Sequence, residues 1–155
     1  MERVVILGPG GAGKSTLARR LGERTGLPVM ELDKHFWSAD LRPLPTDQWR
    51  TRQSELVKGE EWIADGDLGP YDVLEPRLRA ADTVIVLDFP RWRCAWRSVR
   101  RSRERPEFWK WLWTWRRQSR PQLLAAIATF ADHADVETLA SPAAVDRWLY
   151  TVGSR

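Results

Sequence analysis

The chain has 155 residues, of which 43% are hydrophobic and 30% charged, and this balance excludes a disordered chain. A single domain spanning residues 1–155 is expected, because domains most often contain about 100 to 150 residues. The net charge of +4 is uneven: residues 91–120 carry +9 and the remainder −5, which favours a local anion site over a broad nucleic-acid-binding face.

The chain begins with a predicted strand over residues 3–7, because RVVIL is a continuous apolar run of the kind buried on both faces in a parallel sheet. A glycine-rich loop follows. Residues 14–26 then predict a helix that turns Leu17, Ala18 and Leu21 toward the sheet. Since the apolar run 4–7 is too short for a signal peptide or a membrane span, we expect a cytoplasmic protein with no membrane partner.

Strands and helices alternate along the rest of the chain. We predict strands at 28–32, 61–65, 83–88 and 136–140, and helices at 46–58, 91–104, 107–130 and 142–151. This alternation indicates an α/β fold with a parallel sheet. Cys94 is the only cysteine, so it cannot form an internal disulfide and is expected to be a packed thiol.

The loop GPGGAGKST fits the pattern G-x-x-x-x-G-K-[ST] between a predicted strand and a predicted helix. Its glycines let backbone amides curl around phosphate oxygens, and the helix N-terminus adds a partial positive charge. Lys14 would reach the β- and γ-phosphates, and the Ser15 hydroxyl would ligate Mg²⁺. We therefore predict a site for ATP and Mg²⁺ formed by Gly8, Gly10, Gly11, Ala12, Gly13, Lys14, Ser15 and Thr16.

The density of arginines indicates where the γ-phosphoryl goes. Catalysis of phosphoryl transfer is mostly positioning and charge stabilisation, so several arginines near the nucleotide suit a small kinase. Hydrolase-type switches and motors usually need longer chains. The sequence therefore predicts a phosphotransferase whose acceptor is a small molecule: a nucleoside, a nucleotide or another hydroxyl compound.

Four further segments extend the pattern: LDKHFW at 32–37, WIADG at 62–66, PRLRAADTVIVLDFPR at 76–91 and RSVRR at 97–101. With the glycine loop, they make nearly the whole chain resemble the small P-loop kinases related to adenylate kinase, and more closely the bacterial proteins known as DNA topology modulation proteins. The resemblance implies a P-loop NTPase fold: a five-stranded parallel sheet of order 2-3-1-4-5 flanked by helices, with a helical lid at residues 102–120. The chain departs from that family at Asp67, where the family tends to have Asn.

Acidic residues lie at the carboxyl ends of two of the predicted strands. Asp33 comes after the second strand, at the edge where open α/β sheets bind ligands, and would accept the proton of an acceptor hydroxyl or orient that hydroxyl; a cap on the next turn is the alternative. The resemblance implies that Asp65, followed by Gly66, helps to hold hydrated Mg²⁺ beside the acceptor. His35 and Trp37 would line the acceptor pocket if their loop folds over it as in the family, although Trp37 could equally pack in the core.

Arginines supply the predicted nucleotide contacts. Arg97 and Arg101 are one helical turn apart, so both point the same way, and the resemblance implies that they contact the nucleotide; a solvated basic face is the alternative. It also implies that adenine lies between Arg97 and the loop after the fifth strand, beside Ser141 and Pro142. Arg77 would bind an anionic acceptor or be exposed.

The segment FWKWLWTWRRQSR, residues 108–120, joins four tryptophans to arginines. On a helix, an i, i+3, i+4, i+7 stripe would face the core, formed by Phe108, Trp111, Leu112 and Trp115. Trp113 falls on another face, along which the arginines continue. The resemblance implies that this helix closes over the nucleotide, and we expect Arg116 or Arg120 to contact the transferring phosphate. A platform for single-stranded nucleic acid, with tryptophans stacking on bases, is the competing interpretation.

Three functions follow from these alternatives. The first is a Mg-ATP-dependent small-molecule kinase, whose partners are a nucleoside triphosphate and an acceptor. The second is a nucleic-acid-binding regulator of DNA topology with an ATP-binding P-loop. The third is a degraded P-loop protein that only binds nucleotide and a protein partner. The acidic body with one basic segment favours the first, and nucleic acid is not the favoured partner.

Overall fold

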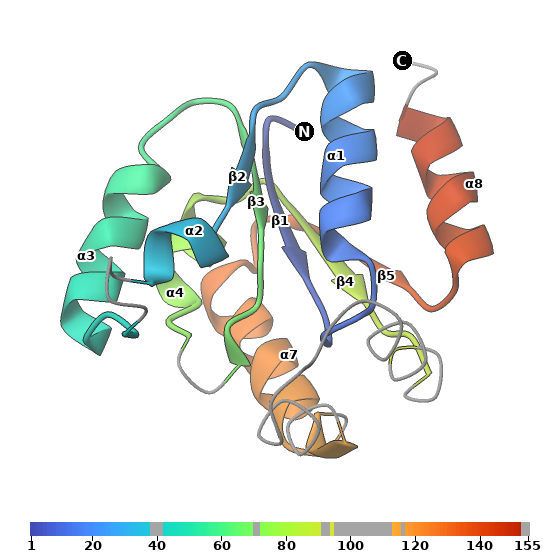
Figure 1. Ribbon diagram of the computed structural model, residues 1–155. Coiled ribbons are helices and arrows are strands. Elements are labelled where there is room, and N and C mark those ends of the chain that lie inside the picture. The colour runs from blue at the N-terminus through green and yellow to red at the C-terminus, as the bar shows by residue number, and fades with distance from the viewer. Residues whose placement is uncertain (38–41, 70–71, 91–93, 95–112, 116, 153–155) are drawn as a thin grey trace.

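The computed structural model describes residues 1–37, 42–69, 72–90, 94, 113–115 and 117–152. Five parallel strands form one sheet in the order β2-β3-β1-β4-β5, which confirms the predicted topology (Figure 1). The strands are β1 Arg3–Leu7, β2 Val29–Glu31, β3 Trp62–Asp65, β4 Thr83–Leu87 and β5 Asp135–Leu139. Each overlaps a predicted strand, which confirms that the alternation of strands and helices in the sequence indicates a parallel sheet.

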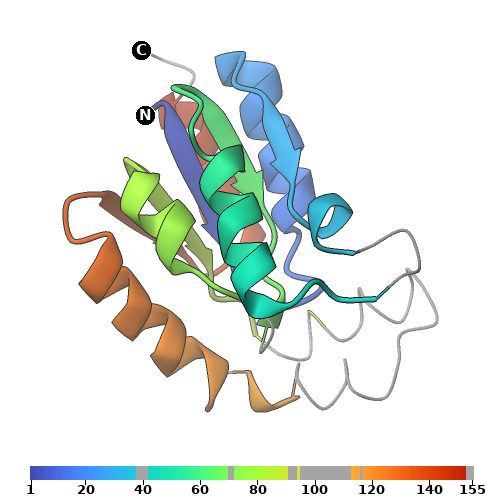
Figure 2. The same ribbon diagram turned by 90° about the vertical axis from the view of Figure 1, so that its left-hand side faces the viewer.

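Helices cover both faces of the sheet. One face carries α1 Lys14–Thr25 and α8 Pro142–Val152. The other, turned to the viewer in Figure 2, carries α3 Thr46–Leu56, α4 Glu75–Ala80 and α7 Ser119–Phe130. A single turn, α2 Asp33–Phe36, follows β2. Among the described residues, no helix has the length and apolar character needed to cross a membrane.

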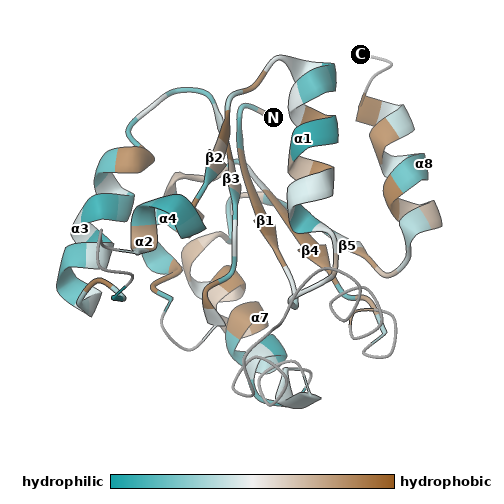
Figure 3. Ribbon diagram, in the orientation of Figure 1, coloured by the Kyte–Doolittle hydropathy of each residue, from teal (hydrophilic) through white to brown (hydrophobic). Residues whose placement is uncertain are grey.

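The core follows from the alternation of side chains along the strands, which send neighbouring residues to opposite faces. Val4 and Ile6 of β1 pack in the cluster under α1 and α8, whereas Val5 and Leu7 pack in the cluster under α3, α4 and α7. Because both faces of the central strands are buried, β1 and β4 are apolar after their first residues, as the brown colour on these strands in Figure 3 shows.

At the amino edge of the sheet, the carboxylate of Asp82 links two strands by hydrogen bonds. Asp82 accepts hydrogen bonds from the backbone amides of Glu2 (2.8 Å) and Arg3 (2.9 Å), and from the Thr83 hydroxyl (2.7 Å). It therefore ties the start of the chain to the start of β4. The opposite, carboxyl edge carries the loops that hold the predicted site residues.

The predicted continuous helix over residues 107–130 is wrong. Residues 117 and 118 form a turn, and α7 begins only at Ser119. Pro121 explains the interruption: inside a continuous helix its ring would clash with the carbonyl of Arg117, whereas in the first turn of a new helix it is tolerated. The chain turns instead through Gln118, and the amide of Arg120 donates to the Trp115 carbonyl at 2.8 Å.

The predicted burial of side chains near this turn is confirmed where the structure describes them. Trp115 is buried and Trp113 is 62% exposed, as expected for different faces of the segment. Cys94 is buried, as predicted for a packed thiol. The predicted helix 91–104, the tryptophan stripe before Trp113 and most of the predicted lid 102–120 lie outside the described residues.

Candidate active site

The glycine loop joins β1 to α1 at the carboxyl edge of the sheet. Gly8 has a φ of +145°, and a Cβ there would lie 2.6 Å from the Leu87 carbonyl oxygen, so the loop can press against the end of β4 only with glycine at this position. Gly13, at φ +96°, is the N-cap of α1 and supplies no side-chain cap. The first amides of α1 are therefore left for an anionic ligand.

Lys14 lies over this loop. Its Nζ donates to the carbonyl oxygens of Gly8 (2.8 Å) and Pro9 (3.2 Å), so the ammonium group sits within the curve of the loop. Ser15 and Thr16 follow in the first turn of α1 and are exposed. The loop thus combines uncapped amides, a cation and two accessible hydroxyl groups, as the sequence predicted for a phosphate site.

Ser15 and Asp65 line the same hollow, which has a volume of 640 Å³ and lies beside α1 and β2. Asp65 is the last residue of β3 and is buried, and its backbone carbonyl accepts from the Leu32 amide at 2.9 Å. A hydroxyl and a carboxylate oxygen are ligands that Mg²⁺ accepts beside phosphate oxygens. The donor set fits the predicted metal, and the contact itself stays a prediction.

Asp33 begins α2, directly after Leu32, at the same edge. Desolvation raises its pKa, the positive charge of Lys14 opposes this, and the negative charge of Asp65 raises the pKa further. The carboxyl group of Asp33 therefore lies close enough to interact electrostatically with Lys14 of the glycine loop, called the phosphate loop below, and with Asp65, the predicted metal ligand. A carboxylate with a raised pKa is a stronger base than an ordinary aspartate.

A short loop after β3 carries two more carboxyl groups. Asp67 Oδ1 accepts from the Gly69 amide at 2.9 Å, and desolvation raises the pKa of Asp67 despite the opposing charge of Lys14. Asp72 Oδ2 accepts from the Leu68 amide at 3.1 Å. In the described part of the loop, these two carboxyl groups thus bond to nearby backbone amides.

Arg77 of α4 contacts this loop and is fully buried. The alternative prediction, that Arg77 is exposed, is therefore wrong. Its Nη1 donates to Gln53 Oε1 (2.7 Å) and Asp72 Oδ1 (2.8 Å), and its Nη2 donates to Asp72 Oδ2. Burial alone would raise the pKa of Asp72, but the charge and hydrogen bonds of Arg77 outweigh it and lower the pKa. The charge of Arg77 is therefore already paired, and an acceptor contact stays only an expectation.

This buried pair gives a stability prediction. Asp72→Asn removes one charge and leaves the Arg77 guanidinium uncompensated, so we expect a loss of about 3–5 kcal/mol in the free energy of unfolding. Because the folded-state pKa of Asp72 is lowered, its contribution is present above the unfolded pKa and disappears as pH falls through the folded pKa. Urea unfolding at pH 7 and at low pH measures both effects.

Asp146→Asn is the matched control, since Asp146 pairs with Arg20 at an exposed site and should matter little. Equal losses in the two variants would show that the pair Arg77–Asp72 contributes no more than a surface ion pair.

The residues after Asp33 divide between core and surface. Phe36 is buried and packs edge-to-face on Trp49, with ring centroids 5.3 Å apart. Trp37 is 43% exposed, so the alternative prediction that it packs in the core is wrong. His35 lines a hollow of 370 Å³ on the outer side of β2, together with Glu31 and Trp62. Its role toward an acceptor stays a prediction.

Arg120 and the loop after β5 also reach the carboxyl edge. Arg120 Nε donates to Asp88 Oδ2 at 3.0 Å, directly after β4. Ser141 caps α8 through its hydroxyl oxygen, which accepts from the Ala144 amide at 3.2 Å, and Pro142 follows as the first residue of that helix. The other predicted arginines lie outside the described residues: Arg97, Arg101 and Arg116.

Sequence reasoning did not assign Asp72 or Gln53 any role. Their shared partner is Arg77, and the three residues come from a loop and two helices. No spacing within one element signals such a cluster. The one available signal was that Asp72 and Arg77 are only five positions apart in the sequence. Two exposed charges would show the same spacing.

Comparison with known proteins supports a kinase-like domain. The adenylate kinase of Mycobacterium leprae (strain Br4923) is 38% identical over a region covering 57% of this chain and 48% of that protein. Adenylate kinase 1 of Nostoc sp. (strain PCC 7120 / SAG 25.82 / UTEX 2576) is 34% identical over 59% of this chain and 48% of that protein. The chain therefore spans about half the length of the curated relatives it matches. No family model matches it.

Solved structures share the fold over nearly the whole chain. Shikimate kinase from Bacteroides thetaiotaomicron aligns with a TM-score of 0.62 and 15% identity, covering 97% of this chain and 96% of that one. A sugar kinase from Janibacter sp. HTCC2649 aligns with a TM-score of 0.61 and 20% identity, covering 98% and 94%. The fold is thus that of the small P-loop kinases, as predicted. The narrower resemblance to DNA topology modulation proteins stays a hypothesis.

Proposed function

We propose that the chain is a phosphotransferase that moves the γ-phosphoryl of Mg-ATP to a hydroxyl group of a small-molecule acceptor. The observation that carries the proposal is the meeting of the uncapped phosphate loop with Asp33 and Asp65 at one edge of the sheet. The relatives and structural neighbours are kinases by name, which supports the same reaction class.

Each residue then has a defined task. The amides of the loop and Lys14 hold the phosphates and balance the charge that spreads over the γ-phosphoryl. Ser15 and Asp65 hold Mg²⁺, which supplies further charge neutralisation when it is bound. Asp33 accepts the proton of the acceptor hydroxyl while the new O–P bond forms and the bond to the β-phosphate oxygen breaks, releasing ADP. Ser141 and Pro142 lie beside the adenine.

The first experiment identifies the acceptor. The protein is incubated with Mg-ATP and a panel of nucleosides, nucleotides, sugars and small alcohols, and products are read by mass. A product heavier than one acceptor by one phosphoryl group supports the proposal. Hydrolysis of ATP to ADP and phosphate that no panel member changes would contradict it.

Asp33→Asn tests the proton acceptor. With the identified acceptor, we expect kcat to fall by about 10²- to 10⁴-fold while ATP affinity stays unchanged, since the amide cannot take the proton. Because Asp33 acts ionised and its pKa is raised, wild-type activity should fall with decreasing pH at a value above the ordinary 3.8 of aspartate.

The control for this variant is Asp132→Asn, which removes the same charge from an exposed turn before β5, at the opposite edge of the sheet. A kcat for Asp33→Asn within a few-fold of that control would show that Asp33 is a structural cap and not the base.

A further inference from the structure

Arg120 and Asp88 form an ion pair at the carboxyl edge of the sheet. Arg120 lies in the first turn of α7, and its Nε donates to Asp88 Oδ2 at 3.0 Å. Asp88 directly follows β4, and its own amide donates to the Leu139 carbonyl, at the end of β5, at 3.0 Å. The backbone of Asp88 is therefore fixed by the sheet, and its carboxylate in turn holds the guanidinium group of Arg120.

Backbone packing connects this pair to the phosphate loop. Leu87 precedes Asp88, and a Cβ on Gly8 would lie 2.6 Å from the Leu87 carbonyl oxygen, so the two backbones touch. Gly8 begins the loop, and its carbonyl accepts from Lys14 Nζ at 2.8 Å. In Figures 1 and 2, α7 also begins on the side of the sheet where β1 ends. Asp88 is thus one residue from the backbone on which the start of the loop packs.

The bond through Nε leaves the far end of the Arg120 guanidinium available. An arginine has five N–H donors, one on Nε and four on the two terminal nitrogens. Among the described residues, Nη1 and Nη2 of Arg120 make no hydrogen bond or ion pair, and its side chain is 36% exposed. These two nitrogens form the fork that binds phosphate oxygens in pairs. Asp88 therefore holds Arg120 from the side and leaves its phosphate-binding end open.

Arg77 shows the opposite arrangement. Both of its terminal nitrogens donate to Asp72, and its side chain is fully buried. A phosphate could reach this guanidinium only by breaking a buried ion pair, which is costly because the separated charge stays buried. Of these two arginines, Arg120 is the one whose terminal nitrogens a phosphoryl group can bind.

We propose that Asp88 is a positioning residue for phosphoryl transfer: it holds Arg120 so that Nη1 and Nη2 meet the transferring phosphoryl group of ATP. The inference rests on the proposed function and concerns the same site. Donors that are oriented before the reaction stabilise developing charge best, and a group misplaced by about 1 Å can cost about 10²-fold in rate. In this role Asp88 acts through Arg120 and contacts neither substrate.

A double-mutant cycle tests the pair. The variants are Asp88→Ala, Arg120→Ala and the double variant, and kcat and the KM for ATP are measured with the identified acceptor. We expect Asp88→Ala to lower kcat by about 10- to 100-fold and to change KM little. In the Arg120→Ala background the same change should have almost no effect, because no guanidinium is left to position. A carboxylate that only supports the fold would slow both backgrounds by the same factor.

Glu75→Gln is the matched control. Glu75 Oε1 accepts from Arg79 Nε at 3.2 Å, which is the same type of bond. The Arg79 guanidinium lies over the ring of Phe130, at the other end of α7, so this variant should have a normal kcat. If Asp88→Ala does not fold, Asp88→Asn takes its place in the cycle, since it keeps the size and one acceptor oxygen; the loss should then be smaller and equally dependent on Arg120.

Where an acceptor is found, kcat decides. A normal kcat in Asp88→Ala or in Arg120→Ala, or an equal loss from the Asp88 change in both backgrounds, overturns the inference. The phosphotransferase proposal then still stands, because transfer itself has been observed.

Where no acceptor is found, binding decides. ADP, Mg²⁺ and aluminium fluoride together mimic the transferring phosphoryl group, and their binding is measured as the rise in Tm beyond that with Mg-ADP alone. If Asp88→Ala and Arg120→Ala each reduce this extra rise and the double variant reduces it no further, the inference holds although the proposed reaction fails. If the extra rise is absent from the wild-type protein or unchanged in Asp88→Ala, the inference fails as well.

Discussion

Replacing Lys14 with alanine is expected to abolish phosphoryl transfer while the chain stays folded. The ammonium group lies inside the phosphate loop, 2.8 Å from the Gly8 carbonyl oxygen, where it would face the β- and γ-phosphates. Removing one such preorganised donor costs about 10²- to 10³-fold in rate, and the loss of a full charge should exceed that. The loop shape comes from the backbone at Gly8 and Gly13, so circular dichroism and Tm should change little.

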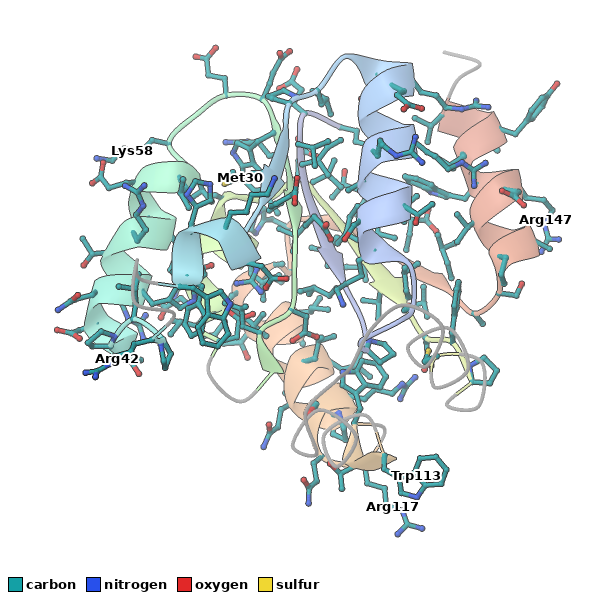
Figure 4. The ribbon with its side chains drawn as sticks, viewed as in Figure 1. Met30, Arg42, Lys58, Trp113, Arg117 and Arg147 are labelled. Carbon is teal, nitrogen blue, oxygen red and sulfur yellow. The ribbon has the colours of Figure 1, made fainter. Side chains whose placement is uncertain are left out.

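Lys58→Ala is the matched control. Lys58 is 68% exposed, pairs with Glu55 at the end of α3 and lies far from the loop in Figure 4. Steady-state rates with the identified acceptor should be normal for this variant. Activity of Lys14→Ala within a few-fold of wild type would remove the phosphate loop from the proposed mechanism.

The second large effect is expected at Arg120. Its guanidinium bonds to Asp88, which directly follows Leu87, the residue against which Gly8 packs. Arg120 is therefore held at the carboxyl edge of the sheet, where the glycine loop also lies, and we expect it to contact the transferring phosphoryl. An arginine that stabilises this charge is worth about 10³-fold or more in rate, so Arg120→Ala should lower turnover by that factor and change ATP affinity little. Single-turnover kinetics measures the two separately.

Arg117→Ala serves as the comparison. Arg117 is exposed and points away from the body of the molecule, near Trp113, in Figure 4. If this segment binds single-stranded nucleic acid instead, both variants should weaken oligonucleotide binding and flatten its salt dependence, and neither should slow transfer to a small acceptor. Unchanged turnover in Arg120→Ala would refute the lid role of this residue.

The sheet could be predicted because its determinants are local. Each central strand is a short apolar run, and a glycine loop with a helix behind it fixes where β1 ends. The order of the strands came from the family resemblance, since no local pattern specifies which strands pair. Position at the carboxyl edge could then be predicted for Asp33 and Asp65, because every strand of a parallel sheet ends there.

Two predictions failed: the continuous helix over 107–130, which one proline interrupts, and the exposure of Arg77, which depends on residues distant in sequence. A long apolar and aromatic pattern suggested one helix over 107–130, and a single proline outweighs that pattern because it removes an amide and adds a clash. The setting of Arg77 depends on Gln53, 24 positions away in another helix. Burial of a charge is a tertiary property, and the residues near Arg77 in sequence, Asp72 included, fit an exposed arginine equally well.

The hydrogen bonds of Asp82 to the start of the chain also determine on which side of the domain an attached group would lie. It holds Glu2 and Arg3 at the amino edge of the sheet, and α8 ends on the same side at Val152 (Figure 1). Both ends of the described chain thus lie opposite the phosphate loop. A fusion partner, an affinity tag or a tether to a sensor surface joined at either end would leave the edge that carries the glycine loop open to solution.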